Sequence, residues 1–226
     1  AYKMQIVHQP GAPLFLMIQN IFSNMAMGDK SQLAYWMNVG SAVSSGLTIL
    51  FLFWSITALG RKIFLGNANL TTSLTSTQSI VVMGAGLVGA LAYAFSDTFW
   101  FSAVESEVYA MSSLCTAVVF WAILKWEVRA DEEGADRWLI FIAYVMGLSI
   151  GVHLLNLLVI PAIALVIYFR KTKQVTKGGA LKAFLLGVVV LGFILWGVIQ
   201  FLIKFAAFTD LFFVNTLGLG FGTGVT

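Results

Sequence analysis

Three carboxylates lie close together in an otherwise apolar stretch of the sequence. Asp97, Glu105 and Glu107 fall within eleven residues of one another, and no other acid occurs between Asp29 and Glu127. Carboxylates can bind a divalent metal ion through oxygen, act as a general base or bond a sugar hydroxyl. The same residues at the start of a helix can instead cap it or favour its dipole. The residue types leave these roles open.

The residues from about Phe101 onward predict a continuous helix. In such a helix Glu105 and Tyr109 share one face at i, i+4, and Glu107 projects about 200° further round. We therefore expect the two glutamates not to act as a close pair. Asp97 precedes the helix by one turn-forming segment and could fold back toward either of them.

Two further segments carry candidate binding residues. His8 precedes Pro10 and Gly11 in a loop that two prolines stiffen, and a fixed imidazole suits phosphate recognition or proton transfer, although a plain turn with an exposed histidine is the alternative. His153 and Asn156 lie between two apolar segments and need polar partners if they are buried. His153 and Asn156 could belong either to a functional site or to a structural junction between two helices.

The composition indicates a membrane protein. The chain of 226 residues is 59% hydrophobic and 10% charged, whereas soluble domains are roughly 45–50% apolar and about 25% charged. Its mean hydropathy is +0.90. The 13 basic residues do not form the polar basic face that nucleic-acid binding needs. No Walker A motif, zinc-ligand spacing or Gly-x-Ser-x-Gly motif occurs.

Six apolar segments predict six transmembrane helices, since a helical span needs about 20 residues. They are 38–59, 79–95, 108–124, 138–152, 154–169 and 183–205. The fourth and fifth adjoin and form either two short spans or one long broken helix. Two spans place ten of the 13 Lys and Arg residues on one side of the membrane, in agreement with the positive-inside rule. We therefore predict an all-α polytopic membrane protein.

This topology divides the chain into three parts. Residues 1–37 form a periplasmic loop, 38–205 the bundle of six helices and 206–226 a periplasmic tail. An amphipathic helix over 13–27, with Pro13 at its first position, is expected to lie in the outer interface. The glycines at 218–224 predict a flexible loop, with backbone N–H groups that cradle a phosphate as the alternative. The acidic turn, the His8 loop and the His153 junction all face the non-cytoplasmic side.

Four runs of the sequence resemble a family of bacterial membrane proteins. They are HQPGAPLF at 8–15, FLFWSIT at 51–57, FSDTFWFSAVESEVYA at 95–110 and GLSIGVHLLN at 147–156. Together they look like the Bacteroidetes proteins grouped as domain of unknown function 2723 and as glycosyltransferase family 117. The resemblance covers nearly the whole chain. That family is similar to animal membrane protein O-mannosyltransferases and belongs to the GT-C class, whose members transfer a sugar from a polyprenyl-phosphate donor on the outer face.

The resemblance implies that this chain holds part of a site. GT-C enzymes place an acidic motif in their first outer loop, and the chain starts inside what corresponds to that loop. We therefore expect a piece of a longer protein whose first acid lies upstream of Ala1. The helix at 13–27 fits the horizontal helix of that loop. The residues carried over are the catalytic candidates Asp97, Glu105 and Glu107, and the substrate-binding candidates Lys3, His8, Pro10, Gly11, His153 and Asn156.

The resulting hypothesis is a glycosyltransferase of a bacterial inner membrane, with its site on the periplasmic face. Glu105, Glu107 or the upstream acid serves as base, and His8 and Lys3 meet the donor phosphate, with a divalent metal ion as another carrier of positive charge. The expected partners are a polyprenyl-phosphate-linked sugar, a periplasmic protein or glycan acceptor and membrane lipids. The alternative is a transporter or a scaffolding subunit of a membrane complex. A transporter predicts inverted repeats or acids near the bilayer midplane, and the sequence shows no clear repeat.

Overall fold

Most of the part of the chain that the structure describes is helical. The structure is a computed structural model, and it describes residues 2–3, 12–66 and 72–224. No strand occurs among these residues. The chain divides into two compact units, Ala1–Leu157 and Leu158–Thr226.

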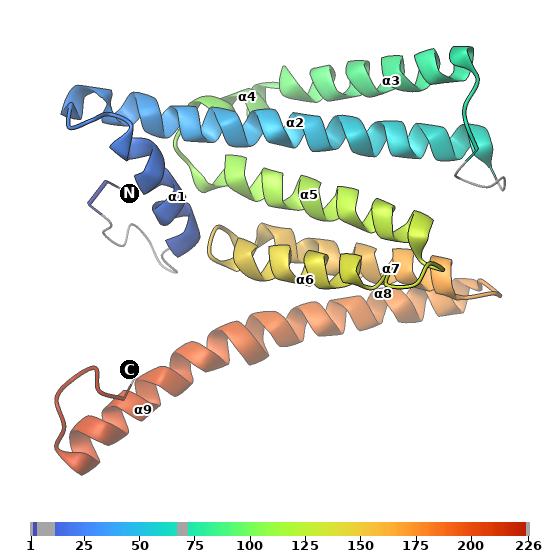
Figure 1. The fold of residues 1–226 in the computed structure, drawn as a ribbon. Coiled ribbons are helices and arrows are strands. Elements are labelled where there is room, and N and C mark those ends of the chain that lie inside the picture. Colours follow the sequence, from blue (N-terminus) through green and yellow to red (C-terminus); the bar gives the residue numbers. More distant parts are fainter. Residues whose placement is uncertain (1, 4–11, 67–71, 225–226) are drawn as a thin grey trace. The chain divides into compact units, whose positions relative to one another are not determined.

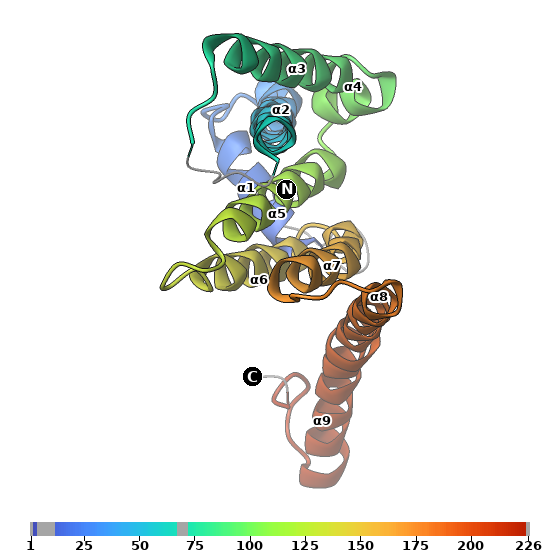
Figure 2. The ribbon, with the colours of Figure 1, turned by 90° about the vertical axis from the view of Figure 1, so that its right-hand side faces the viewer.

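The first unit is built around one long helix. This helix, α2 (Leu33–Leu65), packs against α3 (Ser76–Ala94) and α4 (Asp97–Val104) on one side and against α5 (Val108–Arg129) on another (Figures 1 and 2). Helix α1 (Pro13–Asn24) contacts α2, and α6 (Arg137–Ile150) packs against α5. The short 3₁₀ helices are η1 (Lys30–Gln32) before α2 and η2 (Leu154–Val159) after α6.

The buried face of α2 consists of small residues. Its buried positions are Gly40, Ser41, Ser44, Ser45, Thr48 and Ser55. Large apolar side chains of the same helix, such as Leu50 and Trp54, are exposed. Small residues let helices approach closely where no water drives the apolar groups inward, so this arrangement is typical of a helix that faces lipid. Close packing also fixes Gly86 of α3, because a Cβ there would lie 2.6 Å from Cγ2 of Thr57.

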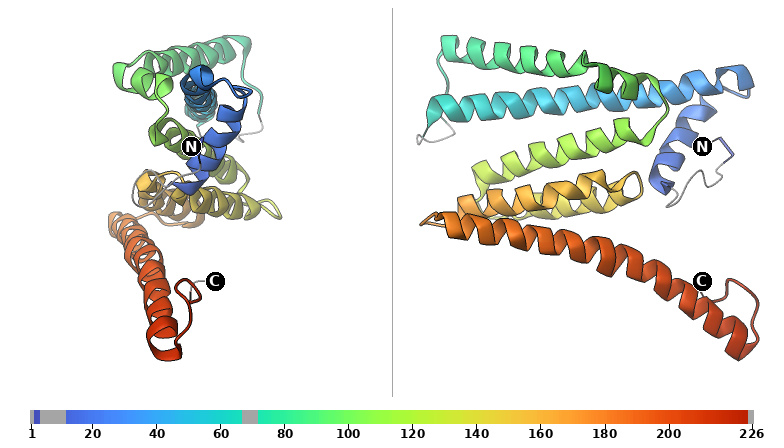
Figure 3. Two further views of the ribbon diagram at one scale, coloured as in Figure 1. Left: turned by 90° about the vertical axis from the view of Figure 1, so that its left-hand side faces the viewer. Right: turned by 180° about the vertical axis from the view of Figure 1, so that it is seen from behind.

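The second unit is a helical hairpin with a long second arm. Helix α7 (Ile160–Lys171) packs against α8 (Lys177–Gly192), which continues through the π-helical segment η3 (Phe193–Gln200) into α9 (Phe201–Leu217). Figure 3 shows this arm as one curved helix. After α9 the chain returns, and the Asp210 carboxylate accepts hydrogen bonds from the N–H groups of Gly222 (2.9 Å) and Gly224 (3.1 Å).

The structure confirms the all-α polytopic class. Within the described residues, five helical stretches are long and apolar enough to cross a membrane: Lys30–Leu65, Ser76–Ala94, Val108–Arg129, Leu154–Lys171 and Lys177–Leu217. The remaining predicted span, 138–152, lies on α6, which has 14 residues and is shorter than the usual 17–25. The last helix continues past residue 205 to Leu217, so helix occupies the first part of the expected tail.

The expected interfacial helix is present in the first unit. It starts at Pro13 as predicted and ends at Asn24, three residues before the expected end at 27. Met27 (φ 49°) and Gly28 (φ 92°) have positive φ angles, so the helix does not continue through these residues.

Candidate functional site

The acidic turn is a break between two helices, which corrects the prediction of a continuous helix from Phe101. Helix α4 ends with Glu105 in an extended conformation (φ −112°, ψ 141°), and α5 starts after Glu107 (φ −121°, ψ 159°). The Glu107 N–H donates to the Glu105 carbonyl oxygen at 2.9 Å, which closes the turn. Glu105 and Tyr109 therefore do not stack at i, i+4. Glu107 instead occupies the N-cap position of α5, where the helix dipole favours a negative charge.

The three carboxylates do not gather into one cluster. All three side chains are exposed. Asp97 begins α4 and Glu105 follows its end, and this helix of eight residues separates them by about 12 Å along its axis. Among the described residues, no group of three or more His, Cys, Asp or Glu side chains lies close enough together to hold a metal ion. Asp97, Glu105 and Glu107 therefore do not form one shared set of ligands.

Glu107 starts the helix that meets the His153 junction. Tyr109, two residues further along α5, has its ring centroid 5.5 Å from that of His153. The Nδ1 atom of His153 accepts a hydrogen bond from the Leu155 N–H at 3.2 Å. In the neutral imidazole this bond leaves the proton on Nε2. The start of α5 thus pairs Tyr109 with His153, two residues after the exposed carboxylate of Glu107.

The amide of Asn156 is buried behind this junction. Asn156 has an exposed fraction of 0%, and its Nδ2 donates to Ser149 Oγ at 3.0 Å. Ser149 Oγ in turn donates to the Met146 carbonyl oxygen at 2.7 Å. The Oδ1 atom of Asn156 is buried and accepts no hydrogen bond from any residue that the structure describes. The Asn156 amide therefore links η2 to α6 through its Nδ2 atom, while its Oδ1 atom has no hydrogen-bond donor among the described residues.

Helix α1 is docked at the same place. The N–H groups of Leu14 and Phe15 both donate to the Gly151 carbonyl oxygen, at 2.8 and 3.2 Å. Beneath these bonds, side chains of α1, α5 and the end of α6 form a small hydrophobic core of Phe15, Leu16, Met111 and Val152. The docking satisfies N–H groups at the helix start that have no partner within the helix. The docking therefore holds the start of α1 against the end of α6.

The remaining predicted residues belong to the N-terminal segment. Lys3 is exposed, and its neighbour Tyr2 accepts a hydrogen bond from Asn20 of α1 at 3.2 Å through its carbonyl oxygen. His8, Pro10 and Gly11 lie outside the described residues. The region defined by Glu107, Tyr109, His153 and the start of α1 is called the junction site below.

Sequence reasoning missed the partner of the C-terminal glycines. Two of their N–H groups donate to Asp210, an acid of this chain that is only 7% exposed, so these donors are already occupied. A Cβ on Gly224 would also collide with the Asp210 backbone. An acid inside an apolar helix was the available signal, because such an acid needs a partner.

The fold and the composition define the class, a multi-pass helical membrane protein. A family model described as the protein O-mannosyl-transferase TMEM260 N-terminal domain matches residues 1–176, and the chain therefore belongs to that family. The match covers the first unit and continues through α7 to Thr176, the N-cap of α8. Searches of curated proteins and of solved structures found no match. The expected likeness to protein O-mannosyltransferases is thus confirmed, while the narrower grouping as domain 2723 stays a prediction.

Proposed function

We propose that this chain is part of a GT-C type glycosyltransferase of a bacterial inner membrane. The enzyme transfers a sugar from a polyprenyl-phosphate-linked donor to a hydroxyl group of a periplasmic protein or glycan. The observation that carries the proposal is the match to a protein O-mannosyl-transferase family over 1–176, which contains the whole junction site. Mannose is the sugar that the family description favours.

The position of the basic residues on α5 supports a periplasmic location for the junction site. Helix α5 has 22 residues and a length of about 33 Å, close to the thickness of a bilayer core of about 30 Å. Glu107 lies at its start, and Lys125 and Arg129 lie in its last turns. Basic residues favour the cytoplasmic side, so the opposite end of α5 faces the periplasm.

Glu107 is the base in this proposal. Its carboxylate takes the proton of the acceptor hydroxyl while the acceptor oxygen attacks C1 of the sugar. The bond from C1 to the phosphate oxygen breaks, and the phosphate leaves with the electron pair. Lys3 and His8 neutralise the charge that develops on the phosphate. We assign no step to a metal ion, because the described carboxylates do not gather into a ligand set.

The test is transfer activity of the full-length protein with a polyprenyl-phosphate mannose donor and an acceptor protein. We expect Glu107→Gln to lower the rate by about 10²–10⁴-fold, the usual contribution of a general base, without loss of membrane expression. Glu105→Gln is the comparison within the turn, and Glu133→Gln is the matched control, an exposed acid of the loop between α5 and α6. Normal transfer by Glu107→Gln contradicts its role as the base, and normal transfer by both Glu105→Gln and Glu107→Gln contradicts the whole proposal and favours a scaffold.

A further inference from the structure

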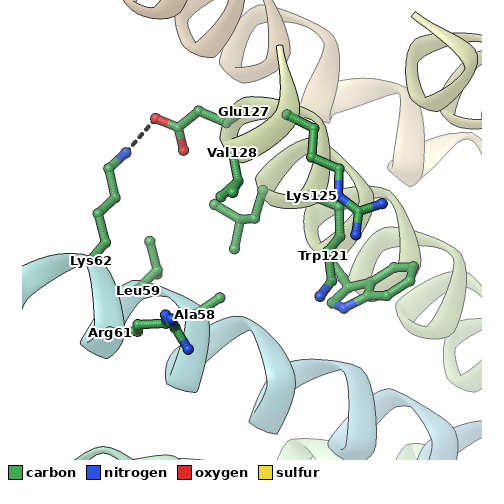
Figure 4. Close-up of a pocket in the computed structure, with 10 residues that line it drawn as sticks. Ala58, Leu59, Arg61, Lys62, Trp121, Lys125, Glu127 and Val128 are labelled. Atoms are coloured by element: carbon green, nitrogen blue, oxygen red, sulfur yellow. Dashed lines mark hydrogen bonds and ion pairs between the residues drawn. The ribbon is translucent and has the colours of Figure 1, made fainter. Parts of the chain in front are cut away.

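The opposite end of α5 holds a basic pocket that the transfer reaction does not use. It has a volume of about 310 Å³ and lies between the ends of α2 and α5 (Figure 4). We name it the basic pocket. Its charged lining residues are Arg61, Lys62, Lys125, Glu127 and Arg129. Four cations and one carboxylate leave a net of three positive charges.

Two of the cations are held in place by neighbours. Arg61 donates from Nη2 to the Thr72 carbonyl oxygen at 2.6 Å. The Lys125 ammonium lies 5.5 Å from the centroid of the Trp121 ring. Lys62 forms an ion pair with Glu127, which accounts for the one acid of the pocket. The contacts to Thr72 and Trp121 bring no negative charge to Arg61 and Lys125, whereas the ion pair offsets the charge of Lys62.

An apolar cavity adjoins the basic pocket. It has a volume of about 490 Å³ and shares Arg61, Trp121 and Lys125 with the basic pocket. Its other lining residues include Trp54, Leu74, Val82 and Met83 of α2, α3 and the segment that joins them. Trp54 and Met83 are 39% and 53% exposed, so the cavity opens toward the surroundings of the helices. Positive charge and apolar surface thus meet at Arg61 and Lys125.

We propose that the basic pocket and the apolar cavity together bind one anionic glycerophospholipid of the leaflet at this end of α5. The headgroup phosphate lies against Arg61 and Lys125, and an acyl chain lies against Trp54 and Met83. Charge complementarity selects the ligand, because basic pockets between transmembrane helices attract anionic headgroups. The sugar donor is not the occupant, since Glu107 lies about 30 Å away at the far end of the helix.

Lipid titration of the purified full-length protein tests the proposal, with bound lipid counted by native mass spectrometry. Dioleoylphosphatidylglycerol is expected to bind tightly and dioleoylphosphatidylcholine weakly. The double variant Arg61→Gln/Lys125→Gln should bind phosphatidylglycerol about 25-fold more weakly, at roughly fivefold for each charge removed. The charge-retaining variant Arg61→Lys/Lys125→Arg should restore most of the binding.

The matched control removes the same charge elsewhere. Lys177 and Lys182 are exposed residues of α8, and Lys177→Gln/Lys182→Gln should leave lipid binding unchanged. Equal weakening by this control contradicts a defined pocket. If the Arg61/Lys125 variant does not fold, equal binding of the two lipids by the unaltered protein overturns the proposal. Displacement of phosphatidylglycerol by equimolar inorganic phosphate or undecaprenyl phosphate also overturns it and assigns the pocket to that ligand.

Discussion

The two ends of α5 differ in how their charged groups are held. At the junction end, Glu107 is exposed at the N-cap of α5, and two residues along the helix the ring of Tyr109 contacts that of His153. At the basic end, cations surround a cavity and one of them is paired with Glu127. An exposed carboxylate at the start of a helix suits proton transfer, whereas fixed cations next to apolar surface suit a bound anion. The junction end and the basic end of α5 are thus separated by about the thickness of a bilayer core.

The largest effect is expected from a charge placed behind the junction site. Asn156→Asp puts a carboxylate at a position with 0% exposure, where the one side-chain hydrogen-bond partner among the described residues is the uncharged Ser149. An uncompensated buried charge costs about 3–5 kcal/mol, so the folded fraction should fall sharply. The measurement is thermal unfolding in detergent together with the monodisperse yield.

Asn156→Leu is the control for this prediction. It removes the hydrogen bond to Ser149 and also removes the buried Oδ1 that has no partner. The two effects oppose each other, so we expect a loss of stability within about 1 kcal/mol. If the Asp and Leu variants are equally stable, residue 156 does not have the buried environment that the structure shows.

A smaller effect is expected where α1 docks. In Gly151→Val the added Cβ would lie 3.0 Å from Cβ of Leu14 and 3.4 Å from its backbone nitrogen, so α1 must shift. Overpacking of this kind costs about 1–3 kcal/mol. Because the start of α1 is part of the junction site, transfer activity should fall by about tenfold or more, since 1.4 kcal/mol corresponds to a factor of ten.

Gly147→Val is the comparison for the α1 prediction. It lies one turn earlier on α6, and a Cβ there meets nothing within 4 Å. Transfer and stability should stay close to those of the unaltered protein. An equal loss in both glycine variants would mean that the effect comes from the helix and not from the docking of α1.

The smallest effect is expected at the basic end. Glu127→Gln removes the one acid of the pocket and frees the Lys62 ammonium. Phosphatidylglycerol should bind about fivefold more tightly, the change expected for one unit of charge. Stability should change by no more than about 1 kcal/mol, because the Lys62 side chain is 46% exposed and water screens the pair. Weaker lipid binding in this variant contradicts the placement of the headgroup.

The sequence predicted the helices better than it predicted their contacts. Hydropathy located every helix long enough to cross a membrane, and Pro13 marked the start of α1, because both signals are local. The break at 105–107 has no proline or glycine to announce it, so a continuous helix was the natural prediction. Arg61 and Lys125 are far apart in the chain, and their convergence depends on how α2 and α5 rotate against each other. The same holds for Tyr109 and His153.

The most direct test of the two-ended account is the sidedness of α5. Glu105 and Glu133 flank this helix and are both exposed, so each can be replaced by cysteine in a Cys115→Ser background. A membrane-impermeant maleimide is then added to intact spheroplasts and to permeabilised ones. The account predicts that Glu105→Cys is labelled in intact spheroplasts and that Glu133→Cys is labelled only after permeabilisation. Labelling of both cysteines from the same side would contradict it.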